Sequence, residues 1–211
     1  MQTTTKVEPA KVSKRYFTTR DVAVIAVFSV LQWFLQHNGA AFLGFLPGAE
    51  RPWVALPVGF LAAVTYMLTR KSGAVGLTML ITGIIQFMLG GFTPVLFEFT
   101  GGAIGAEIVV AGGRAWDHRP LGKIGIGLMG GALMLGRGIG VTTGLLIFVP
   151  TSVLKQTATQ ALLTVYLAFN GVLPFITGII GALIAVGIVA AGRMGHTVSV
   201  PKGQLESKPT T

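Results

Sequence analysis

Long apolar runs recur along this chain and are separated by short polar segments. Several runs approach the roughly 17 to 25 residues that a helix needs to cross a bilayer, whereas soluble core helices carry about 10 to 14. Of the 211 residues only 11% are charged, and the mean hydropathy is +0.73, while a soluble domain is roughly one quarter charged. The runs do not alternate apolar and polar residues as barrel strands do. The sequence therefore predicts an all-α integral membrane protein.

The runs divide into six expected spans that form one helical bundle over residues 20–193. The spans are 20–37, 52–69, 74–91, 95–113, 124–149 and 162–192. We expect a cytoplasmic segment, 1–19, before the bundle and a disordered cytoplasmic tail, 194–211, after it. The first segment is polar and shows no cleavable signal pattern, so we expect the first helix to remain as an anchor. The absence of cysteine excludes disulfides and thiolate metal sites.

The net charge of +9 is explained by membrane topology. With the N-terminus inside the cell, only Arg51 and Lys155 fall on the outer side, and Arg137 lies within a span. The remaining basic residues are cytoplasmic: Lys6, Lys11, Lys14, Arg15, Arg20, Arg70, Lys71, Arg114, Arg119, Lys123, Arg193, Lys202 and Lys208. This bias obeys the positive-inside rule and predicts cytoplasmic termini in a multi-pass cell-membrane protein. Because the basic residues are spread over four cytoplasmic segments and topology explains them, no nucleic-acid partner is expected.

Many of the 30 glycines recur at four-residue spacing within the spans. Gly136, Gly140 and Gly144 do so in the fifth span, and Gly101 and Gly105 do so in the fourth. Small residues at this spacing let helix backbones approach closely in a membrane. The pattern predicts close helix packing.

Three ionisable residues lie within the expected spans: Glu98, Glu107 and Arg137. Such residues cost free energy in a bilayer and usually face a partner or a cavity. At about 100° per residue, the two carboxylates of the fourth span point to opposite faces of the helix. Arg137 lies near the middle of the fifth span, at nearly the depth of Glu107. We therefore predict that Glu107 and Arg137 form a structural ion pair.

Glu98 shares its depth, in the outer half of the bilayer, with polar and aromatic residues of most other spans. They are Trp33, His37, Trp53, Gln86, Tyr166 and Asn170. Each has an ordinary alternative role, as an interfacial aromatic or an amide bonded between helices. Together, aromatic walls, amides and one carboxylate predict a pocket for a small, flat ligand that is nitrogen-rich or cationic.

Enzymatic functions find little support. The motifs G-x-S-x-G and H-E-x-x-H are absent, and the three histidines are too scattered to hold a metal. We expect no cofactor. No P-loop occurs, so ATP-driven transport would need an ATPase on another chain.

Several motifs resemble those of the S components, the six-helix substrate-binding subunits of energy-coupling factor (ECF) vitamin transporters. VLFEFTGG with Glu98, VYLAFNG ending at Asn170–Gly171, and RPWVALP with Trp53 are similar to segments of the thiamine and hydroxymethylpyrimidine branch. GAIGAEIVVAGGR and TRDVAVIAVFSVL resemble the hydroxymethylpyrimidine type. The resemblance implies that Glu98, with the aromatic after it, holds an aminopyrimidine and that Asn170 contacts it.

The resemblance also implies partners: a transmembrane coupling subunit, which docks on an A-x-x-x-A pattern of the first helix, and two cytoplasmic ATPases. Ala23 and Ala26 approximate that pattern but are three residues apart. The segment TSVLKQTATQ lacks the aromatic that thiamine binders place over their ligand, so hydroxymethylpyrimidine is as good a candidate as thiamine. Two alternatives remain open: an S component for another vitamin, and a non-transporting membrane scaffold.

Overall fold

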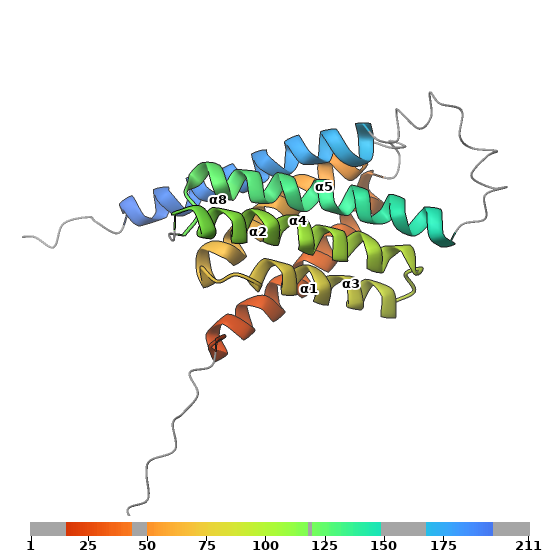
Figure 1. The fold of residues 1–211 in the computed structure, drawn as a ribbon, viewed down its shortest axis with the longest axis horizontal. Coiled ribbons are helices and arrows are strands. Elements are labelled where there is room, and N and C mark those ends of the chain that lie inside the picture. Colours follow the sequence, from red (N-terminus) through yellow and green to blue (C-terminus); the bar gives the residue numbers. More distant parts are fainter. Residues whose placement is uncertain (1–15, 44–49, 118–119, 149–167, 196–211) are drawn as a thin grey trace, which may run out of the picture.

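The computed structural model describes residues 16–43, 50–117, 120–148 and 168–195, and this part of the chain is entirely helical apart from short connections (Figure 1). Its elements are α1 (Thr19–Leu43), α2 (Glu50–Thr69), α3 (Ala74–Met88), α4 (Pro94–Asp117), α5 (Lys123–Phe148), the π-helical η1 (Ala168–Val172) and α8 (Leu173–Gly195). The predicted all-α fold with six long helices is confirmed. The first five predicted spans match α1 to α5, whereas the described part of the sixth begins with η1.

Three helical stretches are long and apolar enough to cross a bilayer: Pro94–Arg114, Lys123–Phe148 and Asn170–Gly192. Two further stretches, Trp53–Thr69 and Ala74–Met88, are apolar but shorter. The chain is therefore an integral membrane protein, as its composition predicts. Most of the two predicted flanking segments, 1–19 and 194–211, lies outside the described residues.

The six long helices pack as a closed ring. α1 contacts α2 and α3, α3 contacts α4, α4 contacts α5, α5 contacts α8, and α8 returns to α2. In Figure 1 most helices run along the long axis of the molecule, and α1 crosses them at an incline. The start of α1 and the end of α8 lie at the same end of the bundle. This arrangement agrees with the expectation that both termini lie on one side of the membrane.

The most extensive helix pair is α4 with α5, and glycines form its seam. A Cβ atom added at Gly101 would come within 3.0 Å of the carbonyl oxygen of Gly136. A Cβ atom added at Gly105 would come equally close to the carbonyl oxygen of Ala132. Such separations are closer than real side chains tolerate. The close helix packing predicted from the glycine spacing is thus confirmed for this pair. The contacts also define the register of the two helices.

Glycines also bring α8 and η1 against their neighbours. Gly178 of α8 lies against Gly59 of α2 and Gly130 of α5. A Cβ atom added at either Gly59 or Gly130 would come within 3.0 Å of the backbone of Gly178. Gly138 of α5 lies in the same way against the backbone carbonyl of Asn170 in η1. The π-helical start of the last helix is therefore packed against the middle of α5.

Candidate ligand-binding site

Arg137 of α5 and Glu98 of α4 form a buried ion pair near the middle of the molecule. Glu98 Oε1 accepts hydrogen bonds from two nitrogens of Arg137, Nε at 3.1 Å and Nη2. Glu98 is only 8% exposed and Arg137 only 7% exposed. A guanidinium that presents two donors to one carboxylate gives a strong, charge-assisted interaction. The pair neutralises both charges within the bundle.

Residues of α4 and α1 surround the Arg137 side chain. Its aliphatic carbons lie over Gly102 of α4, where an added Cβ would come within 3.0 Å of Cγ. The guanidinium carbon is 4.7 Å from the centre of the Phe99 ring, which is within the range of a cation–π interaction. Nη2 also donates to Gln36 Oε1 of α1 at 2.8 Å. These contacts, together with the bonds to Glu98, fix the orientation of the Arg137 guanidinium.

The predicted ion pair between Glu107 and Arg137 is wrong, and helix register is the reason. Because Gly101 lies opposite Gly136, Arg137 lies within one helical turn of Glu98 and about two turns from Glu107. Depths estimated for each helix separately miss this offset. The interleaved glycines of the two sequences could have revealed it.

Glu107 instead binds the start of α3, on the other face of α4. Its Oε2 accepts hydrogen bonds from the Ser72 hydroxyl at 3.0 Å and the Gly73 amide at 2.7 Å, and its Oε1 accepts one from the Gly76 amide at 3.0 Å. The first amides of a helix lack intrahelical acceptors and carry partial positive charge. Glu107 thus caps α3 from a neighbouring helix.

We expect Glu107→Gln to destabilise the protein by about 1 to 2 kcal/mol, because a neutral amide oxygen replaces a charged acceptor. Thermal unfolding in detergent micelles measures the effect. Asn38→Ala serves as the control, since among the described residues the Asn38 side chain bonds the Phe34 carbonyl of its own helix and no other element. Equal stability of Glu107→Gln and the wild type would contradict the capping role.

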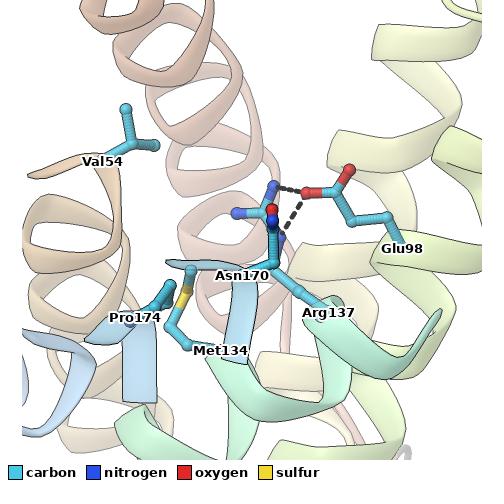
Figure 2. A pocket seen from close by; sticks show the side chains of 7 residues that line it. Val54, Glu98, Met134, Arg137, Asn170 and Pro174 are labelled. Carbon is cyan, nitrogen blue, oxygen red and sulfur yellow. Dashed lines mark hydrogen bonds and ion pairs between the residues drawn. The ribbon is translucent and has the colours of Figure 1, made fainter. Parts of the chain in front are cut away.

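A small cavity adjoins the ion pair between α2, α4, α5 and the start of the last helix (Figure 2). Its volume is about 30 Å³, enough for a water molecule or two. The lining residues are Val54, Glu98, Met134, Arg137, Gly138, Asn170 and Pro174. The cavity therefore combines one ion pair and one amide with apolar walls.

A second, larger hollow of about 300 Å³ also borders Gly138 and Asn170. Its remaining lining is mostly apolar, with two threonine hydroxyls: Leu135, Ile139, Thr142, Thr143, Gly171 and Val172. Both hollows are bordered by Gly138 and Asn170.

The structure brings together two of the seven predicted ligand residues, Glu98 and Asn170. Trp53 is 60% exposed on α2, and its neighbour Val54 faces the cavity instead. His37 is exposed and stacks on Trp33, with ring centres 5.5 Å apart.

Gln86 is half-buried on α3 and is not among the residues that line the cavity. Tyr166 lies outside the described residues. Three lining residues were not predicted from the sequence, Met134, Gly138 and Pro174, and Arg137 was expected to have a structural role alone. No polar signal marks the first three, because methionine, glycine and proline look like ordinary membrane-helix residues.

The two alanines predicted to dock a coupling subunit, Ala23 and Ala26, are both exposed on α1. Large apolar neighbours, Val22, Val27 and Val30, are each more than half exposed on the same helix. This surface of α1 is therefore open to lipid or to another protein.

The chain was compared with known proteins. A solved structure described as an S-component of an ECF transporter superimposes with a TM-score of 0.54. The two sequences are 16% identical, and the alignment covers 86% of this chain and 90% of the other. No protein-family model matches the sequence, and no curated protein matches it. At this identity the likeness establishes a shared fold.

Proposed function

We propose that the chain is the substrate-binding membrane subunit of an ECF-type importer and that it takes up a thiamine-type pyrimidine. The observation that carries the proposal is the small cavity at which Glu98, Arg137 and Asn170 meet, in a fold shared with an S component. A buried ion pair that lines a cavity is typical of ligand sites in membrane proteins.

The chemistry of the cavity suits an aminopyrimidine. A carboxylate can accept from the exocyclic amino group of such a ring, and an asparagine amide can both donate to and accept from its edge. Met134, Pro174 and Val54 provide apolar contact for the ring faces. Glu98 and Asn170 lie on α4 and η1, so a ligand between them would link α4 to the start of the last helix.

Ligand entry requires the cavity to open. A volume of about 30 Å³ is far below the roughly 300 to 1,000 Å³ of small-molecule pockets. The adjoining hollow of about 300 Å³ supplies the missing space if η1 moves away from α5. π-helical segments occur frequently at functional sites. In this proposal η1 is the wall that moves.

The proposal includes partners. A transmembrane coupling subunit would dock on the exposed face of α1 around Ala23 and Ala26, and two cytoplasmic ATPases would supply the energy. The chain itself would bind its substrate without catalysing a reaction. Copurification of a coupling subunit and ATPases with the tagged chain from native membranes tests this assembly.

Ligand binding tests the site. We expect purified protein to bind hydroxymethylpyrimidine or thiamine with micromolar or tighter affinity in a calorimetric titration. Glu98→Gln should weaken binding by about tenfold or more, since a charge-assisted hydrogen bond contributes roughly 1.5 to 3 kcal/mol.

Glu107→Gln is the matched control, because it makes the same change on the opposite face of α4 and should leave the affinity within about twofold. Tight binding that is unaffected by Glu98→Gln would contradict the assigned site. If neither compound binds, the substrate is wrong, and another vitamin or a scaffold role is favoured.

A further inference from the structure

Two buried nitrogens have no hydrogen-bond acceptor among the described residues: Nη1 of Arg137, which lines the cavity, and Nε2 of Gln36, which is bonded to Arg137. The orientation of the Gln36 amide is fixed, because its Oε1 accepts from Arg137 Nη2. In Figure 2 the third guanidinium nitrogen points away from Glu98, toward the side of the cavity where Val54 lies. Buried donors are nearly always paired, so unpaired ones next to a cavity indicate a missing acceptor.

The charge balance of the cavity also favours a ligand that supplies an acceptor over one that carries a positive charge. Arg137 already neutralises Glu98, and Glu98 is the only acidic residue among the described residues that line the cavity. A ligand with a permanent positive charge would therefore lie near the Arg137 guanidinium, and no second carboxylate among the described lining residues would neutralise the ligand's charge. In a buried site such a charge is strongly unfavourable.

We propose that Arg137 and Gln36 make this site selective for neutral or anionic ligands that present an oxygen or ring nitrogen as acceptor, and that Arg137 excludes permanent cations. The inference rests on the proposed function and distinguishes between its two candidate substrates. Hydroxymethylpyrimidine is neutral and carries a hydroxymethyl oxygen and two ring nitrogens as acceptors. Thiamine carries a thiazolium cation next to the same pyrimidine. The site should therefore prefer hydroxymethylpyrimidine.

Three probes separate charge from size in calorimetric titrations of the purified chain. They are hydroxymethylpyrimidine, thiamine, and a neutral thiamine isostere in which an uncharged triazole ring replaces the thiazolium. We expect hydroxymethylpyrimidine to bind at least tenfold more tightly than thiamine, and the isostere to recover most of that difference. An isostere that binds as weakly as thiamine overturns the charge argument, because size alone then explains the preference.

Variants of the two donors add a second measurement. Gln36→Met removes one donor and leaves the bonds between Arg137 and Glu98 in place, so it should weaken hydroxymethylpyrimidine binding about three- to tenfold. Asn38→Ala on the same helix is the control. Arg137→Gln should raise the affinity for thiamine relative to hydroxymethylpyrimidine at least tenfold, because Glu98 then lacks its counter-charge. If Arg137→Gln fails to fold, the Gln36→Met variant and the three probes still test the selectivity.

The possible failures are distinguishable. Thiamine binding as tight as that of hydroxymethylpyrimidine overturns the selectivity and leaves the proposed function standing. Unchanged binding by Gln36→Met overturns the role of that donor. Absence of binding by all three probes overturns both the proposed function and this inference.

Discussion

Replacing Arg137 by methionine is expected to destabilise the protein by about 3 to 5 kcal/mol, the largest effect of any single substitution considered for this chain. The substitution leaves the Glu98 carboxylate buried without its cation, and it also removes the donor to Gln36. Glu98→Gln/Arg137→Met removes both charges. Because burying an ion pair itself costs free energy, the double variant should recover a large part of the loss.

A double-mutant cycle measures this coupling. The free energy of unfolding of each variant is obtained from denaturant titration in mixed micelles, and the cycle is repeated with Glu107 in place of Glu98. We expect a coupling energy of roughly 1 to 3 kcal/mol between Arg137 and Glu98, and less than about 0.5 kcal/mol between Arg137 and Glu107. Coupling to Glu107 as large as that to Glu98 would contradict the observed register of α4 and α5.

Gly101→Ala should have the second-largest effect, a loss of about 1 to 3 kcal/mol from overpacking the seam between α4 and α5. The new methyl group would meet the Gly136 carbonyl, and a helix backbone cannot move aside as a flexible side chain can. Gly112→Ala is the control on the same helix, because nothing lies within 4 Å of its added Cβ. The control should be neutral or more stable by up to about 1 kcal/mol, since alanine favours helix over glycine.

Thermal unfolding of the two glycine variants in the same detergent compares them directly. The expected result is a lower unfolding temperature for Gly101→Ala alone. Equal destabilisation by both variants would indicate a general intolerance of the helix to substitution and would contradict a seam specific to Gly101 and Gly136.

The helices of this protein were largely predictable from sequence because the length of each apolar run indicates the length of the helix that it forms. Runs between polar segments predicted the bounds of α2 to α5 to within about four residues, whereas α1 extends six residues beyond its predicted end. Glycine spacing also predicted close packing. Neither signal depends on how distant parts of the chain pair, and that is why both succeeded.

The ligand site was less predictable, because it depends on which way each side chain faces. In a soluble helix the apolar stripe identifies the buried face, but in a membrane helix the lipid-facing side is apolar as well. Trp53 and Val54 differ by only about 100° around α2, yet Val54 faces the cavity and Trp53 is exposed. Likewise, a register offset of two turns decided which carboxylate pairs with Arg137.

The central claim is that a transported small molecule binds where Glu98, Arg137 and Asn170 meet. The most direct test is an experimental structure of the chain determined with hydroxymethylpyrimidine bound. We predict a ring in contact with Glu98 and Asn170, an acceptor atom within hydrogen-bond distance of Arg137 Nη1, and η1 displaced from Gly138. A ligand bound elsewhere, with the contact between Gly138 and Asn170 unchanged, would contradict the account.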